Sequence, residues 1–517
     1  MRLLLIALAA WAGFSLASVL ALYSYGRFAK RARGAPSSAL PVHAGGTPLD
    51  ELVAPLLAQR PGQSGLMLLA GNLDAFAVRA LTARHAGRSL DLQYYIWQGD
   101  LTGRLLAGEI LKAADRGVRV RLLLDDINAH PFDRTWLALD AHPNIAVRLF
   151  NPSRNRRDAL RRAVEMLLRA ASVTRRMHNK AWIADGRLAV LGGRNIGDAY
   201  FDADETSNFR DMDLLLLGEM VRQTEAIFDD FWNSGAVIPI GALKEPRAGD
   251  LPKLRNKLTG LAAQEEARPY LDRVARDPSV RAMLSGEVPI HWMDNARVIS
   301  DPPEKAAGER QKDWLMQSIR PLIASATTDL ELISPYFIPG EAGTDQLVAM
   351  VRKGVRVSIL TNSLAATDVV AVHGAYAHYR KVLVEAGVRL FELKPYDRHS
   401  DVSLFGSSSA SLHTKAFTVD GRRGFVGSMN FDPRSVSLNT EMGVMFGHGE
   451  LVAEISEIFA DETSPRKSYR LRLADGKLVW QDRSAGTART LHEEPGAGIG
   501  RRLAAAVIGL LPIQSQL

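Results

Sequence analysis

The chain begins with a long apolar run that predicts a membrane anchor. Residues Leu3–Tyr23 carry no charge. In a helix these roughly 21 residues span about 31 Å, enough to cross one bilayer. Four basic residues follow at once, which favours a cytoplasmic location for the rest of the chain: Arg27, Lys30, Arg31 and Arg33. We therefore expect a single-pass membrane anchor over residues 1–26, with a cleaved signal peptide as the alternative.

After a Pro/Gly/Ser-rich linker over residues 27–60, the pattern changes to alternating short and long elements. Short β-branched runs alternate with helix-length amphipathic stretches, for example Thr102–Arg116 and Gly343–Lys353. This alternation predicts α/β units built around a parallel or mixed sheet.

The pattern occurs twice. Three segments of the first half resemble segments of the second half at offsets of 240, 237 and 241 residues: Leu90–Trp97 with Leu330–Phe337, Arg116–Leu123 with Lys353–Leu360, and Val147–Phe150 with Val388–Phe391. Retained order and spacing indicate a duplicated domain. We expect two similar halves that form a pseudo-dimer around one shared site.

These patterns divide the chain into segments. Residues 61–242 are the expected first half, 243–287 a helical connector insert, and 288–450 the second half. Residues 451–517 form a C-terminal appendage with a hairpin, predicted from Asp475-Gly476 between two apolar strands. The appendage ends in the apolar run Leu503–Leu511, which is too short to span a bilayer and packs either on the membrane surface or on the core.

The composition excludes several kinds of functional site. The chain has no cysteine, which excludes disulfides, thiolate metal sites and a cysteine nucleophile. Its 64 Lys+Arg against 57 Asp+Glu give a net charge of +7, an excess too small to identify a nucleic-acid partner. The excess is concentrated in Arg154–Arg176, where apolar residues recur at helical spacing. This segment is either an amphipathic helix that docks on anionic lipid or a solvated helix face.

A polar motif is duplicated with identical spacing. The first copy runs from His178-Asn179-Lys180 through Asp185 to Gly192-Gly193-Arg194-Asn195, and the second from His413-Thr414-Lys415 through Asp420 to Gly427-Ser428-Met429-Asn430. Each His and Lys share one face of an extended strand, and each Asp-Gly forms a tight turn that brings the Asn back beside them. Two facing copies place two imidazoles in a cationic site.

This set of groups suits a phosphodiester. The two Lys and two Asn can bind the non-bridging oxygens, one imidazole can attack phosphorus, and the other can protonate the leaving alkoxide. Asp211 and Glu441 are candidates for the carboxylates that orient and support the rings. Asp185 and Asp420 are either catalytic or structural turn residues. We expect no metal and no cofactor, and we predict these catalytic residues: His178, Lys180, Asp185, Asn195, Asp211, His413, Lys415, Asp420, Asn430 and Glu441.

The duplicated HxK(x)4D(x)6G[GS]xN pattern resembles the phospholipase D superfamily. The segments LDLQYYIWQ, RMHNKAWIADG and GSMNFDPRSVSLNTEMG are similar to bacterial cardiolipin synthases of the C type. The resemblance implies a phosphatidyltransferase that acts through a phosphohistidine and makes cardiolipin from phosphatidylglycerol and a second phospholipid, phosphatidylethanolamine or phosphatidylglycerol. It also implies His178 as nucleophile and His413 as general acid, although the residues alone leave their order open.

The resemblance further implies phospholipid substrates and a bacterial inner (cytoplasmic) membrane as the location of the anchor. We expect no nucleic acid as partner, because the chain carries an apolar anchor and the basic segment has no aromatic residues. Arg434 and Ser435 are candidates for contacts to the lipid phosphate, to the catalytic groups or to the neighbouring core. Two other functions stay open: a phosphodiesterase of the phospholipase D type that hydrolyses phospholipid or, less in keeping with the anchor, nucleic acid; and a non-catalytic membrane scaffold.

Overall fold

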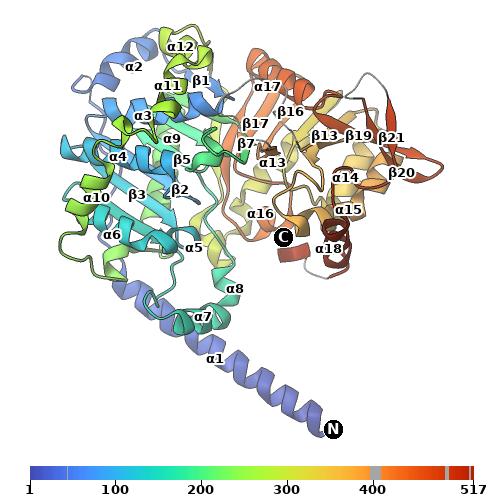
Figure 1. The fold of residues 1–517 in the computed structure, drawn as a ribbon, viewed down its shortest axis with the longest axis horizontal. Coiled ribbons are helices and arrows are strands. Elements are labelled where there is room, and N and C mark those ends of the chain that lie inside the picture. The colour runs from blue at the N-terminus through green and yellow to red at the C-terminus, as the bar shows by residue number, and fades with distance from the viewer. Residues whose placement is uncertain (44, 396–408, 484–487, 512–513, 517) are drawn as a thin grey trace.

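The computed structural model describes residues 1–517 except 44, 396–408, 484–487, 512–513 and 517. Two α/β halves lie side by side, and the helix α1 (Arg2–Ala32) extends away from the first half as a long rod (Figure 1). The two-half α/β organisation and the apolar N-terminal helix expected from the sequence are both present.

The first half is built on a nine-stranded sheet in the order β10-β1-β8-β6-β5-β2-β3-β4-β9. Its strands β2, β3 and β4 are parallel, and the remaining pairs are antiparallel, so the sheet is mixed. The strands are β1 (Ser64–Leu69), β2 (Ser89–Tyr94), β3 (Arg119–Asp125), β4 (Ile145–Phe150), β5 (Ala181–Ala184), β6 (Leu188–Gly192), β8 (Asp213–Leu217), β9 (Val237–Pro239) and β10 (His291–Met293).

The second half repeats this order as β11-β18-β17-β16-β12-β13-β14-β19 and adds β20 and β21 at its edge. The matching order confirms the duplication. The expected hairpin is β19 and β20, joined by Asp475 and Gly476 with positive φ. The strands are β11 (Arg297–Ser300), β12 (Asp329–Ile333), β13 (Arg356–Asn362), β14 (Arg389–Leu393), β16 (Ala416–Val419), β17 (Arg423–Gly427), β18 (Met442–Phe446), β19 (Ser468–Ala474), β20 (Lys477–Asp482) and β21 (Arg489–Leu491).

The boundaries expected at 288 and 450 do not coincide with the boundaries of the sheets. Strand β10 lies beyond residue 288, yet it pairs with β1 and so completes the first sheet. Helix α17 (Gly449–Glu462) and β19 lie largely beyond residue 450, yet they match α9 (Glu219–Trp232) and β9 of the first half. The first half therefore extends through β10, which follows the connector helices and covers the free edge of β1.

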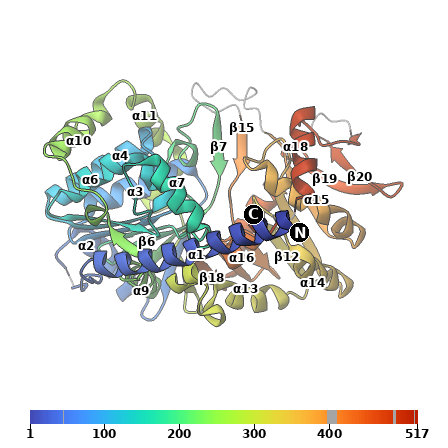
Figure 2. The same ribbon diagram turned by 90° about the horizontal axis from the view of Figure 1, so that it is seen from below.

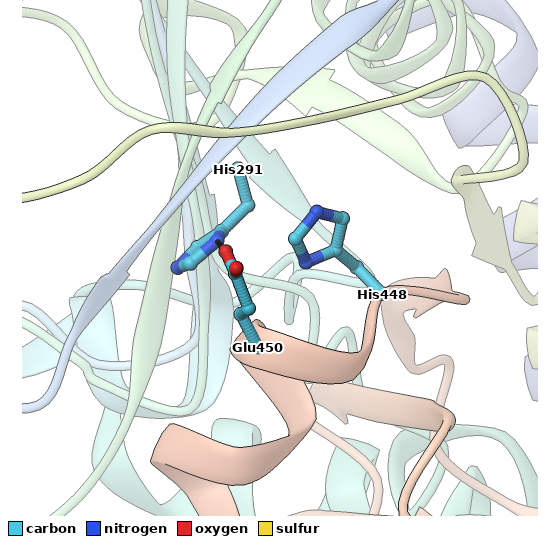
Figure 3. A group of neighbouring side chains, drawn as sticks. All are labelled: His291, His448 and Glu450. Carbon is cyan, nitrogen blue, oxygen red and sulfur yellow. Dashed lines mark ion pairs between the residues drawn. The ribbon is translucent and has the colours of Figure 1, made fainter.

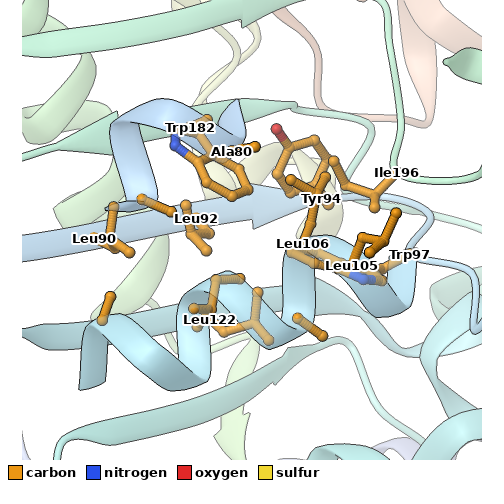
Figure 4. Close-up of a cluster of buried hydrophobic side chains, with 14 of the residues drawn as sticks. Ala80, Leu90, Leu92, Tyr94, Trp97, Leu105, Leu106, Leu122, Trp182 and Ile196 are labelled. Carbon is orange, nitrogen blue, oxygen red and sulfur yellow. The ribbon is translucent and has the colours of Figure 1, made fainter. Parts of the chain in front are cut away.

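Helices cover both sheets and enclose separate apolar cores. The outer core of the first half packs α3 and α4 on the sheet around Tyr94, Trp97 and Trp182 (Figure 4). A middle core packs α9 and α17 between the two sheets, so it belongs to both halves. An outer core of the second half lies under α13, α14 and α15. These helices are α2 (Pro48–Ala58), α3 (Asn72–His85), α4 (Leu101–Asp115), α5 (Asp126–Ala129), α6 (Asp133–Asp140), α13 (Leu315–Ala324), α14 (Gly340–Arg352), α15 (Val370–Glu385) and α16 (Pro433–Ser437).

The connector is helical, as expected, and belongs to the first half. It forms α10 (Asp250–Leu258), α11 (Arg268–Arg276) and α12 (Pro278–Ser285). Its buried residues Leu258, Tyr270 and Val280 join the outer core of that half. At the other end of the chain, α18 (Ile499–Gly509) packs on α15 with Ala505 buried, while Leu503 and Val507 stay exposed.

The basic segment Arg154–Arg176 contains α7 (Ala159–Leu168) and α8 (Ala170–Val173), but only part of its charge faces solvent. Arg156, Arg169 and Arg176 are buried in ion pairs with first-half carboxylates, so these three arginines belong neither to a solvated face nor to a lipid-docking face. The apolar face of α7 is the part that is uncovered. Leu160, Val164 and Leu167 are 74%, 48% and 61% exposed.

Candidate active site

The two histidines lie where the halves meet. Residues His178–Lys180 lead into β5, and His413–Lys415 lead into β16, the equivalent strand of the second half. Both rings are almost fully buried, at 8% and 7% exposure. The structure therefore brings the two motif copies to one interface, as the duplication predicted.

Each ring bonds a carboxylate from the other half. The Nδ1 of His178 lies 2.8 Å from Glu441 Oε2, and the Nδ1 of His413 lies 2.5 Å from Asp211 Oδ2. An Nδ1–H donated to a carboxylate leaves Nε2 as the free nitrogen of the ring. Asp211 and Glu441 thus serve the rings as predicted, but the pairing is crossed between halves, which the spacing within each copy did not indicate.

Main-chain bonds hold this crossed arrangement in place. The amide of His178 donates to the carbonyl of Thr440, which directly precedes Glu441, at 2.9 Å. The amide of His413 donates to the carbonyl of Arg210, which directly precedes Asp211, at 2.8 Å. Each histidine is therefore fixed by its backbone and its ring to consecutive residues of the opposite half. The strand pair β7 (Ser207–Arg210) and β15 (Ser409–Leu412) extends the second of these contacts.

Small residues of the motif make room for the carboxylates. A Cβ at Gly193 would lie 2.3 Å from Asp211 Oδ1, so the second glycine of the first copy allows that carboxylate to approach. The equivalent residue of the second copy is Ser428, whose hydroxyl donates to Glu441 Oε2 at 2.5 Å. Ser435 donates to Glu441 Oε1 at 2.8 Å, which makes it a positioning residue for the carboxylate.

The lysines and asparagines complete a polar, enclosed site. Lys180 and Lys415 are each 1% exposed and donate to the carbonyls of His178 and His413. The Asn195 side chain bonds the Tyr200 hydroxyl and the Ile96 amide. The Oδ1 of Asn430 is buried and has no hydrogen-bond partner within the described ranges.

Burial and neighbouring cations shift the pKa of every ionisable group in this site. Burial, with Lys180, Lys415 and His413 nearby, holds the pKa of His178 well below its usual value. Burial and Lys415 also lower the pKa of His413, although Asp211 opposes the shift. Burial lowers the pKa of Lys180 to about 7 and that of Lys415 to about 8. At neutral pH the ring of His178 is therefore neutral, whereas Asp211 favours the protonated form of His413.

The pKa values of the two carboxylates shift in opposite directions. Burial raises the pKa of Glu441 to about 7, because the nearby Lys180 and the two serine hydroxyls offset desolvation only in part. Burial also acts on Asp211, but His413 and Lys415 outweigh it and hold its pKa below the usual value. Asp211 is therefore ionised at neutral pH, and Glu441 is close to its midpoint.

Asp185 and Asp420 do not lie with the rings. The Asp185 carboxylate accepts hydrogen bonds from the amides of Gly87, Arg88 and Ser89, at the opposite end of β5 from His178. Asp420 accepts bonds from the amides of residues 327, 328 and 329 in the same way. The expectation that these two residues act in catalysis is corrected: each is a turn residue with positive φ that ties its hairpin to the neighbouring strand.

Arg434 and three aromatic residues also take defined places. Arg434 donates to the carbonyls of Thr174 and Gln516, so it joins the two halves and the C-terminus near the site.

The sequence analysis did not identify the aromatic rings that pack on the histidines. Tyr95 packs on His178, and Tyr200 and Phe209 pack on His413. Tyr95 lies in the repeated segment LDLQYYIW, and this placement is the one signal in the sequence that pointed to it.

Potential metal ligands gather at a different place. In the described part of the chain, one group of histidines and carboxylates is close enough to hold an ion: His291, His448 and Glu450 (Figure 3). Asp211 and Glu441 are already occupied by the rings.

Comparison with known proteins supports one family. A family model described as cardiolipin synthase, PLD-like domain, matches residues 82–232 and 319–462, and each range contains one of the two histidines. The chain is 40% identical over 472 residues to cardiolipin synthase C of Escherichia coli (strain K12), which covers 90% of this chain and 99% of that protein. It is 31% identical over 458 residues to an uncharacterized protein of Helicobacter pylori (strain ATCC 700392 / 26695), which covers 87% and 88%.

A solved structure shares the fold. The crystal structure of phosphatidylserine synthase from Haemophilus influenzae Rd KW20 matches with a TM-score of 0.56 at 13% identity, over 90% of this chain and 99% of that one. At this identity the likeness concerns the fold alone.

We predict that His178→Ala and His413→Ala each lower turnover of a phosphodiester by three or more orders of magnitude, because one imidazole is needed as nucleophile and one as acid. Since the two rings act as a unit, the double variant should be little worse than either single one. Turnover of the three variants decides this, with the exposed His85→Ala as control and thermal unfolding to establish folding. Near-normal turnover by either single variant would contradict the two-histidine site.

We also predict a bell-shaped dependence of kcat/KM on pH with its maximum near neutrality. Below about pH 7, Glu441 gains a proton and no longer accepts the Nδ1–H of His178. Above about pH 7 to 8, Lys180 and Lys415 lose the charges that bind substrate oxygens. In Glu441→Gln the amide does not titrate, so the acid limb should move to lower pH, where His178 itself protonates. An unchanged acid limb in this variant would show that Glu441 does not set it.

Proposed function

This chain belongs to the cardiolipin synthase family with PLD-like domains, and we propose that it is a phosphatidyltransferase that makes cardiolipin through a phosphohistidine. The observation that carries the proposal is the crossed pair of imidazoles, each bonded through Nδ1 to a carboxylate of the opposite half, with Lys180 and Lys415 beside them. Because each Nδ1 is bonded to a carboxylate, Nε2 is the reactive nitrogen of each ring: it is the nucleophile where the ring is neutral and the acid where the ring is protonated.

The electrostatics favour His178 as nucleophile and His413 as general acid. The pKa of His178 is lowered the more strongly, so its ring stays neutral and keeps a lone pair on Nε2. His413 faces Asp211, which is ionised at neutral pH and stabilises a protonated ring. This assignment agrees with the roles that the family resemblance implies.

In the first step, Nε2 of His178 attacks the phosphorus of a donor phospholipid. The bond from phosphorus to the headgroup oxygen breaks, and His413, which enters this step protonated at Nε2 with Asp211 balancing its charge, gives that proton to the departing alkoxide. The products are a phosphatidyl group on His178 and a free alcohol, which is ethanolamine from phosphatidylethanolamine or glycerol from phosphatidylglycerol. The ammonium groups of Lys180 and Lys415 and the amides of Asn195 and Asn430 offset the charge on the non-bridging oxygens.

In the second step, the glycerol hydroxyl of phosphatidylglycerol attacks the same phosphorus. His413 takes the hydroxyl proton, the phosphorus–nitrogen bond breaks, and cardiolipin leaves with His178 restored. Water in place of the hydroxyl would give phosphatidic acid instead, so transfer requires that the acceptor lipid reaches the phosphohistidine before water does.

An apolar pocket next to the site suits a lipid substrate. The pocket has a volume of about 410 Å³, and most of its lining is apolar, with Met316, Ile338, Leu347 and Phe431 among the residues. Arg320 and Asp432 add charged groups to its wall. Phe431 directly follows Asn430, so the pocket adjoins the polar site along the chain. We assign it to part of an acyl chain.

Helix α1 supports a membrane anchor that holds the catalytic body close to the lipid. Its 31 residues span roughly 46 Å, longer than the apolar thickness of a bilayer. The excess length packs on the first half: the guanidinium of Arg169 lies 3.2 Å from the ring centroid of Tyr25, and that of Arg154 lies 5.0 Å from the ring of Phe28. The basic residues after the apolar run support a cytoplasmic catalytic body.

Two further helices present apolar faces on the side from which α1 extends. Helix α7 lies along α1, and α18 lies on the same lower side of the body in Figure 1. Figure 2 shows this side from below, with α1 crossing in front of the body. The exposed apolar side chains would enter the interface: Leu160 and Leu167 on α7, Leu503 on α18, and Leu510 directly after α18. The exposed Arg157 and Arg161 would meet anionic headgroups.

The proposed activity is tested with the full-length protein in vesicles of phosphatidylglycerol alone or with phosphatidylethanolamine. We predict that mass spectrometry detects cardiolipin, with ethanolamine released if phosphatidylethanolamine is the donor. His178→Ala should form no cardiolipin and no phosphoenzyme. Phosphatidic acid as the main product, carrying ¹⁸O from labelled water, would instead identify a hydrolase.

The exposed apolar residues of α7 and α18 form the proposed docking surface on the membrane. We test it with single cysteines, because the chain has none of its own. We predict that an environment-sensitive dye on Leu160→Cys or Leu503→Cys of the full-length protein in nanodiscs is quenched by nitroxide-labelled lipid. A dye on Asp272→Cys, on α11 at the opposite side of the body, should not be quenched. Equal accessibility of all three positions to a water-soluble quencher would contradict the docking surface.

A further inference from the structure

A second cluster of polar side chains joins the two halves away from the catalytic rings. His291 lies on β10, at the edge of the first sheet. His448 and Glu450 lie at the beginning of α17, which matches α9 of the first half and packs in the middle core. One ligand atom from each of the three residues lies within 4.8 Å of the others (Figure 3).

The hydrogen bonds of His291 leave one ring nitrogen directed at the cluster. Its Nε2 lies 2.7 Å from Glu454 Oε1, so in the neutral ring Nε2 donates to Glu454 and Nδ1 keeps a lone pair. Nδ1 lies 3.6 Å from Glu450 Oε2. A histidine that binds a metal through one nitrogen commonly donates its other N–H to a carboxylate in this way.

The second histidine has an unsatisfied nitrogen at the same place. Nδ1 of His448 is buried and has no hydrogen-bond partner in the described part of the chain. The His291 and His448 rings lie 4.9 Å apart between centroids. A buried ring nitrogen without a partner is costly, and a ligand that accepts its lone pair would remove that cost.

We propose that His291 Nδ1, His448 Nδ1 and the Glu450 carboxylate bind one Zn²⁺ ion, with Glu454 orienting His291. Two imidazoles and one carboxylate are ligands that Zn²⁺ prefers, whereas Mg²⁺ and Ca²⁺ prefer oxygen alone. Ligand atoms about 2.0–2.2 Å from a zinc ion must move slightly closer together than they are here. The Glu450 side chain is 83% exposed and is free to make that movement.

The site has a structural role. Glu441 directly precedes β18 (Met442–Phe446), and His448 lies just after it. The chain between them is extended, so the zinc ligands lie roughly 23 Å along the chain from the catalytic carboxylate. The ion therefore takes no part in the transfer. It ties β10, the edge strand of the first sheet, to the helix of the second half that matches α9.

The test uses the full-length protein in detergent, without a polyhistidine tag and after treatment with a chelator. Zn²⁺ is titrated by calorimetry, and Co²⁺ is added as a spectroscopic probe of the same site. We expect one ion per chain, a rise in Tm on addition of Zn²⁺, and visible absorption bands of Co²⁺ bound by imidazole nitrogen. Glu450→Gln and His448→Gln should weaken Zn²⁺ binding at least tenfold and abolish the rise in Tm.

Glu457→Gln is the matched control, because Glu457 is exposed on the same helix outside the cluster. It should bind Zn²⁺ like the wild type. Glu454→Gln, which alters only the partner of His291, should weaken binding by about 10- to 100-fold. The proposal is overturned if the wild type binds no Zn²⁺ at micromolar concentration, or if Glu450→Gln and His448→Gln bind it as tightly as the wild type does.

Discussion

The bond between each catalytic imidazole and a carboxylate of the opposite half is the constraint on which the arrangement of this protein depends. His178 needs Glu441, and His413 needs Asp211, so neither half contains a complete site. The backbone bonds to Thr440 and Arg210 set the distance between the halves at the rings. The shared middle core then supplies the apolar burial that keeps the two sheets at that distance.

The same arrangement explains how a cationic site is tolerated inside the protein. Burial lowers the pKa of both lysines and both histidines, so the site does not hold four full positive charges in the absence of substrate. A bound phosphodiester brings a negative charge that favours the protonated lysines. The difference between Asp211 and Glu441 makes the two rings chemically unequal, although the fold around them is nearly symmetric.

Local patterns in the sequence predicted the duplication, the mixed α/β halves, the hairpin at Asp475 and the residues that meet at the interface. The crossed pairing was not predictable, because spacing within one motif copy says nothing about which partner lies opposite it in the folded chain. The pairing of β10 with β1 was not predictable for the same reason. In the basic segment, the sequence pattern does not separate buried from exposed arginines. Arg156 pairs with Asp126 and Asp133 in the interior. Arg176 pairs there with Asp125.

The crossed pairing also affects how the protein is made. His178 and Glu441 are 263 positions apart, and His413 and Asp211 are 202 positions apart. Contacts of such long sequence separation form late, after loop closure over most of the chain. While the ribosome is still adding the second half, the nascent first half exposes the free edge of β1 and an imidazole without its carboxylate. A stalled or truncated chain thus carries a membrane helix and half a fold but no means of cleaving the lipid around it.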